Sequence, residues 1–358
     1  MKKRIKILLT FDYELPLGGI VKDYAHSLFD PTSKLLQLAE EIGVPIVLFA
    51  DILSYTKFRE WNVDEYTDQF SRQLNLAYSL GHDVQLHLHP HWLKMEYKSN
   101  QFVPSNKFSL SEFYNESYPN NIEGIITSGI KELTSLLYQN GGDYRCIAYR
   151  AGGYNLAPNT TEILEALYKN GIRYDSSIAR GYYFVSDDSV VDFRNIPKTS
   201  NWYLPFNGDL SLANKSSNAI FEIPIATKPK GVFEIPTTFK LKKYAYRKVE
   251  NRGKMIHSNS SVKKKDKIKQ LLSSRMLTVD NHTYSIEYLM KILDYNVKKF
   301  KNEDEIVLSL IGHPKSMGNY HFEMLSAFVQ SSKKKYGDEI VFVTFRDLYN
   351  ENHHQMNS

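Results

Sequence analysis

Val84-Gln85-Leu86-His87-Leu88-His89-Pro90-His91-Trp92 runs from a strand-like segment directly into three histidines. A hydrophobic core seldom needs three histidines on alternate positions. His87 and His91 are four residues apart, so a helical turn after the strand would point both imidazoles the same way, toward one metal ion. Asp12 and Glu14 follow a second strand-like run near the N-terminus. Two histidines with one or two carboxylates favour a hydrolytic metal site.

Composition is that of a soluble globular protein. The chain has 358 residues, of which 42% are hydrophobic and 24% charged, and its net charge of +5 does not by itself indicate nucleic acid. Cys146 is the only cysteine, which excludes a disulfide framework and a thiolate metal cluster and fits a reducing compartment. Neither a signal peptide nor an apolar run of about 20 residues is recognisable. We therefore expect a cytoplasmic protein.

Strand-like and helix-like segments alternate along most of the chain. Strands are predicted at 7–10, 45–50, 84–88, 146–149, 174–176, 306–311 and 340–344, and helices at 30–43, 64–80, 122–138, 159–169, 284–300 and 320–331. Such alternation predicts a parallel sheet. In a barrel of parallel strands, the carboxyl ends of the strands share the face where active sites lie. The candidate residues at those ends are Asp12, His87, Arg150, Asp175 and His313.

The middle of the chain, about 180–280, breaks this rhythm. Segments 220–226 and 232–238 are near copies, and the proline within each favours edge strands. A basic stretch follows, with Lys240, Lys242, Lys243, Arg247, Lys248, Arg252, Lys254, Lys263, Lys264, Lys265, Lys267 and Lys269. This stretch is either a solvated helix and loop or a contact for an anionic carrier or a membrane surface. No nucleic acid is expected, because no aromatic platform accompanies the basic residues. The tail at 351–358 is predicted to be disordered.

Five short pieces carry a family resemblance. They are Thr10-Phe11-Asp12-Tyr13-Glu14, His87-Leu88-His89-Pro90-His91, Arg150-Ala151-Gly152-Gly153-Tyr154, Tyr174-Asp175-Ser176-Ser177 and Leu310-Ile311-Gly312-His313-Pro314. In this order they resemble the polysaccharide deacetylases of carbohydrate esterase family 4, most closely those linked with lipopolysaccharide and other surface-polysaccharide biosynthesis in bacteria. The resemblance covers about 1–180 and 300–350. It implies an α/β fold with parallel strands, a single distorted (β/α)7 barrel over 1–350, in which 180–280 is an insertion.

The resemblance also implies a chemistry and a set of roles. The family removes N-acetyl groups from sugars with one divalent metal ion, commonly Zn²⁺. Carried over to this sequence, His87 and His91 are metal ligands, Asp12 is the base, Arg150 orients that base, Tyr154 supplies a backbone N–H to the oxyanion and His313 is the general acid. Asp175 either orients His313 or has a structural role.

One position departs from the family pattern. Tyr13 stands where the family usually has a second aspartate as the third metal ligand, so Glu14 is the expected replacement. Three functions follow. The first is a metal-dependent deacetylase acting on an N-acylated sugar or polysaccharide precursor. The second is a small-amide hydrolase working with or without metal. The third is a barrel that binds glycans without catalysis.

Overall fold

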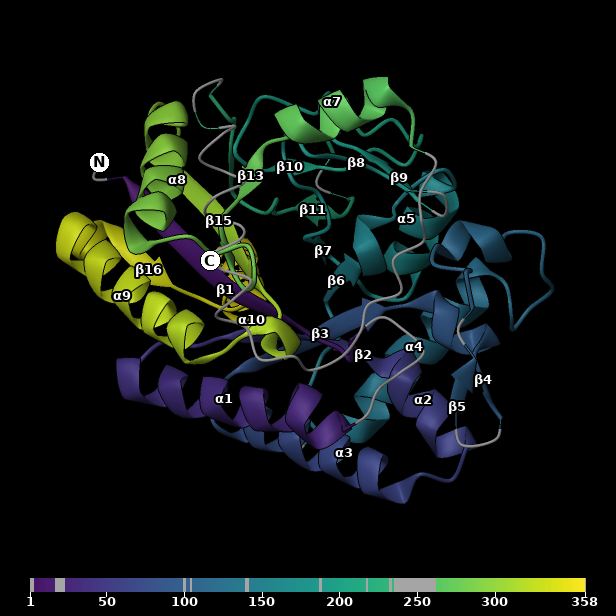
Figure 1. Ribbon diagram of the computed structural model, residues 1–358. Helices are drawn as coiled ribbons and strands as arrows, with labels where there is room; N and C mark the ends of the chain where they lie inside the picture. The colour runs from purple at the N-terminus through teal and green to yellow at the C-terminus, as the bar shows by residue number, and fades with distance from the viewer. Residues whose placement is uncertain are drawn as a thin grey trace.

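The computed structural model of the chain describes residues 3–16, 23–98, 101–103, 105–138, 142–186, 189–216, 218–231, 234 and 262–357. Its centre is one curled sheet surrounded by helices (Figure 1). In order across the sheet, the strands are β10 (Trp202–Tyr203), β11 (Phe221–Glu222), β7 (Tyr174–Asp175), β6 (Ala148–Ala151), β3 (Asp83–Leu88), β2 (Val47–Asp51), β1 (Arg4–Tyr13), β15 (Glu305–Gly312) and β14 (Thr278–Val279), with β16 (Ile340–Phe342) also on β1.

β1 is the central strand, and every residue of it after Arg4 is buried. Its first half pairs with β16 and its last four residues pair with β2, while β15 runs along its other edge. All of these pairings are parallel, and among the strand pairs that the described residues form in this sheet only β10 with β11 is antiparallel. The carboxyl ends of the parallel strands therefore meet on one face.

Residues after β11 bring the two sides of the sheet together. Ile225 forms one bridge to Ala179, just after β7, and another to Ser309 of β15. Ala226 continues the contact, because its N–H donates to the carbonyl of Ser309 at 2.8 Å. These bridges curl the sheet into a distorted barrel, which confirms the predicted fold class.

Helices cover the outside of the sheet (Figure 1). They are α1 (Asp30–Ile42), α2 (Ile52–Glu60), α3 (Asp64–Ser79), α4 (Ile122–Leu137), α5 (Thr160–Lys169), α8 (Ile286–Lys299), α9 (Asn319–Tyr336), α10 (Phe345–Asn357) and the peripheral α7 (Lys264–Leu272). α1 shows how the sequence determines where such a helix begins and ends. It begins at Asp30-Pro31, where proline suits the first turn, and ends at Gly43, whose φ of 61° a residue with a side chain rarely adopts.

Two parts of the chain differ from the sequence prediction. β10, β11 and β14 come from the segment that was predicted to be an insertion, so this segment also builds the main sheet. The sequence predicts a disordered tail at 351–358, whereas α10 continues to Asn357. Two reciprocal bonds cap the start of α10: the hydroxyl of Thr344 accepts from the N–H of Asp347 at 3.1 Å, and Oδ2 of Asp347 accepts from the N–H of Thr344 at 2.8 Å. The predicted strand at 232–238 lies outside the described residues apart from 234.

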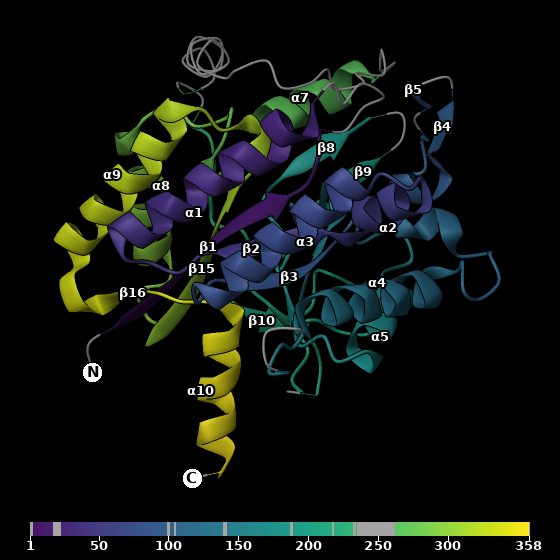
Figure 2. The same cartoon turned by 90° about the horizontal axis from the view of Figure 1, so that it is seen from below.

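The two ends of the barrel carry different elements. Figure 2 shows α7 at the end toward which β1 runs, whereas α10 projects from the opposite end. Polar side chains at the carboxyl end of the sheet thus share a face of the molecule with α7. Within the described ranges, no helix is long and apolar enough to cross a membrane.

Candidate active site

The end of β1 places Asp12 and Glu14 on one face of the sheet. Residues two apart on an extended strand share a face, and the residue between them points the other way. Tyr13 accordingly points into the core, where its hydroxyl donates to Oε1 of Gln73 at 2.9 Å and its ring lies 5.1 Å from that of Phe70. Position 14, rather than 13, therefore brings a second carboxylate into the site.

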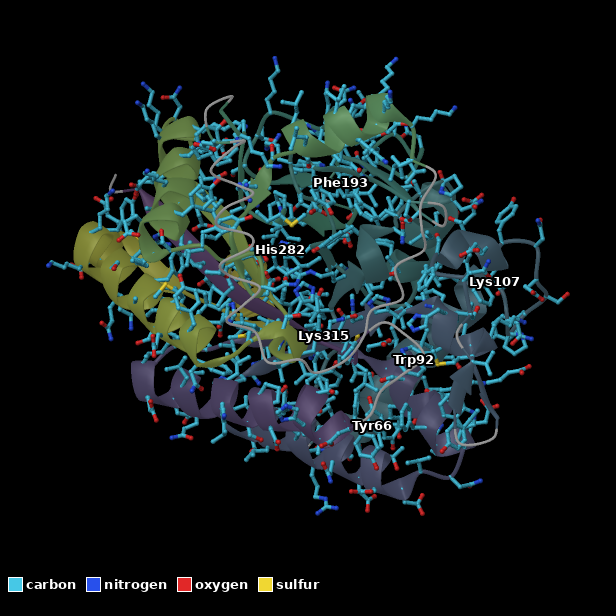
Figure 3. The ribbon with its side chains drawn as sticks, in the orientation of Figure 1. Tyr66, Trp92, Lys107, Phe193, His282 and Lys315 are labelled. Carbon is cyan, nitrogen blue, oxygen red and sulfur yellow. The ribbon has the colours of Figure 1, made fainter. Side chains whose placement is uncertain are left out.

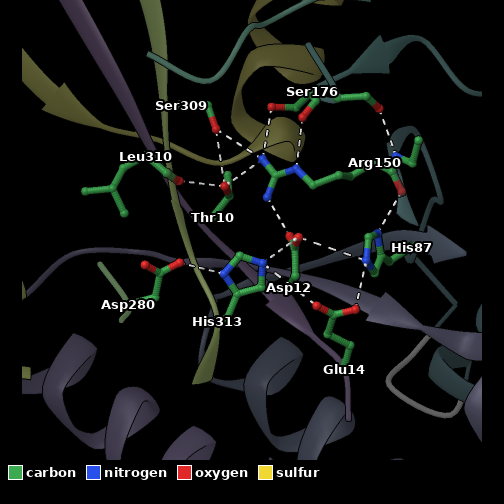
Figure 4. Close-up of polar contacts among 12 residues, drawn as sticks. Thr10, Asp12, Glu14, His87, Arg150, Ser176, Asp280, Ser309, Leu310 and His313 are labelled. Carbon is green, nitrogen blue, oxygen red and sulfur yellow. Dashed lines mark hydrogen bonds and ion pairs between the residues drawn. The ribbon is translucent and has the colours of Figure 1, made fainter. Parts of the chain in front are cut away.

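Asp12 is held by a buried arginine (Figure 4). Nη1 of Arg150, from β6, donates to Oδ1 of Asp12 at 2.6 Å. Burial alone would raise the pKa of Asp12, but neighbouring positive charge, that of Arg150 foremost, outweighs it and holds the pKa below its ordinary value. Asp12 is consequently ionised at neutral pH and able to accept a proton.

The Arg150 side chain is itself held by several contacts. It donates to the hydroxyl of Thr10 at 2.7 Å, to the carbonyl of Ser176 at 2.9 Å and to the hydroxyl of Ser309 at 3.2 Å. Its guanidinium also lies 4.3 Å from the ring centre of Phe49. A guanidinium held from several strands in this way can keep Asp12 in a single orientation.

His87 and His89 present their imidazoles side by side. β3 ends at Leu88, and His89 remains extended with φ −108° and ψ 91°, so the two histidines share a face. Nδ1 of His87 lies 2.8 Å from the carbonyl oxygen of Arg150. A carbonyl can only accept, so Nδ1 carries the proton and Nε2 keeps its lone pair for a cation.

Asp51, at the end of β2, fixes the turn that carries His89. Its Oδ1 accepts from the N–H of His89 at 3.1 Å, and its Oδ2 accepts from the indole N–H of Trp92 at 2.7 Å. In the strand register, Asp51 lies directly beside His87. Gly152 is needed nearby, because a Cβ there would come within 2.8 Å of Nδ1 of His89.

Glu14, His87 and His89 form a group that fits a metal ion. One oxygen of Glu14 and one nitrogen of each histidine lie within 4.8 Å of one another. These atoms are Oε2 and the two Nε2, all buried, and none makes a hydrogen bond within the described part of the chain. Nε2 of His87 is 3.5 Å from Oε2 of Glu14, and Nε2 of His89 contacts it directly. Two imidazoles and one carboxylate are a known donor set of catalytic zinc sites.

The structure does not bring His91 into this group, although it was a predicted ligand. The prediction needed a helical turn after the strand that would align His87 with His91, but the chain stays extended through His89 and a 3₁₀ turn begins only at Pro90. The His91 ring packs instead between Trp92 and Phe108, with ring centres 5.0 and 5.4 Å away. A spacing of two residues, rather than four, pairs the imidazoles here.

Lys315 reaches Glu14 from the other side. Its Nζ lies 2.8 Å from Oε1 of Glu14 and donates to the carbonyl of Leu15 at 3.2 Å. Burial would raise the pKa of Glu14, but Lys315 and His89 outweigh it and hold the pKa well below its ordinary value. Lys315 is near the centre of the molecule in Figure 3. Glu14 is thus ionised, with one oxygen toward the lysine and one toward the imidazoles.

His313 follows β15 and faces Asp12. Its Nε2 lies 3.5 Å from Oδ2 of Asp12, and its Nδ1 lies 2.8 Å from Oδ2 of Asp280 (Figure 4). Burial would lower the pKa of His313, but its contacts with Asp12 and Asp280 raise it to about 10. His313 is therefore protonated at neutral pH and can act as an acid.

Asp175 does not orient His313, because Asp280 is the carboxylate that contacts Nδ1 of His313. Oδ2 of Asp175 accepts from the hydroxyl and the N–H of Ser177, at 2.6 and 3.1 Å. Its strand neighbour is Glu222, which is also fully buried. Burial raises the pKa of Asp175 to about 7 and that of Glu222 well above its ordinary value. Of the two roles considered for Asp175, the structure favours the structural one.

Tyr154 lies beside the site, in the 3₁₀ turn Gly152–Tyr154 after β6. Its φ is 63°, an uncommon value for a residue with a side chain. Burial and then the charge of Asp12 raise the pKa of its phenol well above the ordinary value. The predicted role of its backbone N–H remains a prediction.

Sequence reasoning missed several residues of the site. Asp51 is the last residue of β2, and Asp280 directly follows β14. An acidic residue at the carboxyl end of a strand was the sequence signal that could have indicated both. Lys315 is two residues beyond His313, and a lysine there carried no recognisable pattern. His89 was recognisable as the middle histidine of the three. The sequence prediction, however, paired His87 with His91 through a helical turn that the structure does not form at this point.

Comparison with solved structures identifies the fold. A protein assigned as a polysaccharide deacetylase in Mycobacterium smegmatis matches with a TM-score of 0.50 and 14% identity, over 99% of this chain and 92% of the other. One so assigned in Pseudomonas aeruginosa PAO1 gives 0.51 and 14%, over 98% and 92%. Puue allantoinase gives 0.51 and 11%, over 98% and 91%. The chain thus has the barrel fold of the polysaccharide deacetylases, as the five sequence pieces predicted.

The comparisons do not extend to activity. No protein-family model matches the chain, and no curated protein is a significant match to its sequence. At 11–14% identity the structural likeness establishes the fold alone. The function has to be argued from the site.

Proposed function

We propose that the protein is a metal-dependent hydrolase that removes an acetyl group from the nitrogen of an N-acylated sugar or polysaccharide precursor. The observation that carries this proposal is the pairing of an ionised Asp12 with a protonated His313, 3.5 Å apart, beside the group of Glu14, His87 and His89. A base and an acid with opposite protonation states at one pH are what amide hydrolysis requires.

Glu14, His87 and His89 would hold the cation. The chemistry supplied by a divalent ion at these residues would be a lowering of the pKa of a water toward about 7 and polarisation of the acyl carbonyl. The ligand set favours Zn²⁺. His87 is already in the tautomer needed, since its Nδ1–H is committed to the carbonyl of Arg150.

The chain's own residues supply the proton transfers. Asp12 takes the proton of the attacking water at Oδ2, the oxygen that Arg150 leaves uncovered. His313 gives the proton on Nε2 to the leaving nitrogen, while Asp280 holds Nδ1 and stabilises the charged imidazole. Each such transfer contributes on the order of 10²–10⁴ in rate. The N–H of Tyr154 remains the proposed oxyanion donor.

A second candidate, a small-amide hydrolase that works without metal, is favoured by one observation. Lys315 neutralises Glu14, and Arg150 neutralises Asp12, so both carboxylates already have a cationic partner in the protein. The barrel of an allantoinase has the same fold. Activity on small amides that survives thorough chelation would favour this alternative.

The test is acetate release from N-acetylglucosamine oligomers by the purified protein, with bound metal measured in parallel. We expect zinc or a similar ion near one per chain, acetate release that chelation removes and zinc restores, and loss of turnover with retained metal in Asp12→Asn. Fully active Asp12→Asn would refute the assignment of the base. Metal-loaded protein inert on every N-acyl sugar would refute the substrate class. A role in lipopolysaccharide synthesis and a cytoplasmic location remain predictions.

A further inference from the structure

α7 is turned with its polar side toward the protein. On the inward side, Oδ1 of Asp266 accepts from the hydroxyl of Tyr183 at 2.8 Å, and the side-chain amide of Gln270 donates to the carbonyl of Val185 at 2.7 Å. None of the helix's residues is buried. A surface helix normally directs its apolar residues inward, so this orientation is the reverse of the usual one.

Apolar side chains occupy the outward side instead. Ile268 is 59% exposed and Leu272 is 53% exposed. They are four residues apart and therefore lie one above the other on the same face of the helix. This pair of large aliphatic side chains is therefore accessible to an external partner, because α7 makes its contacts with the protein through polar groups.

Lysines flank this apolar pair. Lys264 is one turn before Ile268 on the same stripe, and Lys265 and Lys267 border it; all three are exposed. Their side chains make no hydrogen bond or ion pair with the described part of the chain. The other basic residues of the predicted stretch, at 240–254, lie outside the described residues. The chemistry is that of a basic amphipathic helix, with aliphatic residues at the centre and lysines at the margins.

The position of α7 relates this surface to the active site. α7 packs on β8 (Tyr183–Val185), which follows the carboxyl end of β7, and seven residues separate the end of α7 from Asp280. Figure 2 shows α7 at the same end of the molecule as the carboxyl end of β1. A surface that receives α7 would therefore face the end of the barrel that carries the site.

We infer that the outward face of α7 docks on an anionic lipid bilayer, with Ile268 and Leu272 entering the headgroup boundary and the lysines binding acidic headgroups. Aliphatic insertion and electrostatic attraction are both present on one helical face, which a soluble anion would not require. The inference does not depend on the proposed reaction, and binding can be measured without turnover.

The experiment is flotation of the full chain with vesicles of phosphatidylcholine alone or with about 30 mol% phosphatidylglycerol, a composition with a strongly negative surface. We expect binding to the anionic vesicles only, and a several-fold loss when salt rises from about 0.1 to 0.5 M. Ile268→Asp/Leu272→Asp should lower binding at least tenfold. Lys264→Glu/Lys265→Glu/Lys267→Glu should do the same.

The matched control is Leu76→Asp/Leu80→Asp. These leucines are also four residues apart, 51% and 40% exposed, but they lie at the carboxyl end of α3, on the opposite end of the barrel. This variant should bind vesicles as the unmodified chain does. All variants should retain the melting temperature of the unmodified chain, since none of the replaced side chains is buried.

Several outcomes would overturn the inference. Failure of the unmodified chain to float with anionic vesicles would end it, and so would vesicle binding that the Ile268/Leu272 variant retains. Binding to heparin that depends on the lysines but not on Ile268 and Leu272, without vesicle binding, would assign the surface to an anionic polymer. A concentration-dependent dimer that Ile268→Asp abolishes, without vesicle binding, would assign it to a second copy of the chain.

Discussion

Nζ of Lys315 lies 2.8 Å from Oε1 of Glu14, while the other oxygen of that carboxylate faces Nε2 of His87 and His89. The lysine and a divalent cation would thus share one carboxylate from opposite sides. Two positive charges on one ligand repel each other, and this repulsion weakens cation binding.

The first prediction concerns Lys315→Met. Removing the ammonium frees Oε1 of Glu14 and removes the repulsion, so we expect zinc to bind at least about tenfold more tightly, which requires only about 1.4 kcal/mol. Competition with a chromophoric chelator measures the affinity. Lys315→Arg, which keeps the charge, should bind zinc as the unmodified protein does. Weaker binding in Lys315→Met would mean that the lysine serves mainly to hold Glu14 in position.

The second prediction separates the two histidines after β3. His87→Ala and His89→Ala each remove a proposed metal ligand. Removing a residue that only hydrogen-bonds a ligand typically lowers metal affinity by roughly 10- to 100-fold, and we expect both variants to lose more than this. His91→Ala should change affinity by no more than about threefold, because its ring packs on Trp92 and Phe108.

Isothermal titration with zinc measures this difference, and melting temperature shows whether each variant is folded. The pattern opposite to the expected one, with His91→Ala losing metal and His89→Ala keeping it, would restore the ligand pair first predicted from the sequence. His91 is useful as a control since it is as buried as the other two.

The direction of the strands accounts for most of the placements that the sequence predicted. The sequence predicts Asp12 at a strand end, and Glu14 as the replacement for a ligand that Tyr13 cannot supply. In the structure Asp12 and Glu14 share one face of β1, and Tyr13 packs in the core. The ends of β3, β6 and β15 likewise placed His87, Arg150 and His313. These predictions needed only the direction of a strand and the shared face of parallel strand ends.

The placements that differ from the prediction depend on backbone geometry that local sequence does not determine. The chain remains extended at His89, where Asp51 of a neighbouring strand holds its N–H, and this tertiary contact decides which histidine pairs with His87. Asp280 follows a strand of only two residues, too short to show alternation. Lys315 meets Glu14 across 301 positions of sequence, a contact that no local pattern reveals.

The third prediction concerns Asp280, which holds Nδ1 of His313 at 2.8 Å. Asp280→Asn keeps an oxygen for the N–H of His282 but removes the charge that helps raise the pKa of His313 to about 10. The general acid must be protonated, so activity falls as pH rises through this pKa. We expect the alkaline limb of the pH–rate profile to move to lower pH, with turnover reduced and metal affinity nearly unchanged.

A double-mutant comparison makes this prediction sharper. His313→Ala should lose on the order of 10²–10⁴ in turnover, and adding Asp280→Asn to it should cost little more, because the aspartate acts through the imidazole. Additive losses would instead show that Asp280 acts independently of His313.

The fourth prediction uses the buried neighbours Asp175 and Glu222. The positive charge of Arg150 interacts with both carboxyl groups, and that of Arg180 interacts with Glu222. The phenol of Tyr149 interacts with Asp175. The pKa of Asp175 is raised to about 7 from an ordinary value of 3.8, so folding favours the protonated carboxyl. Its stabilisation is complete below about pH 4 and is lost as pH rises through about 7. Each pH unit in this window costs at most about 1.4 kcal/mol per group.

Asp175→Asn should therefore lessen the fall in unfolding free energy between pH 5 and pH 8, by at least about 1 kcal/mol relative to the unmodified protein. An asparagine oxygen can still accept from Ser177, so the variant should fold. Chemical denaturation at the two pH values measures the difference, and Asp83, whose pKa burial raises to about 6, contributes equally to both proteins. Asp338→Asn, the same change at an exposed position, should leave the pH dependence unaltered. An identical pH dependence in Asp175→Asn would show that Asp175 is ionised in the folded protein, with Arg150 close enough to compensate its charge.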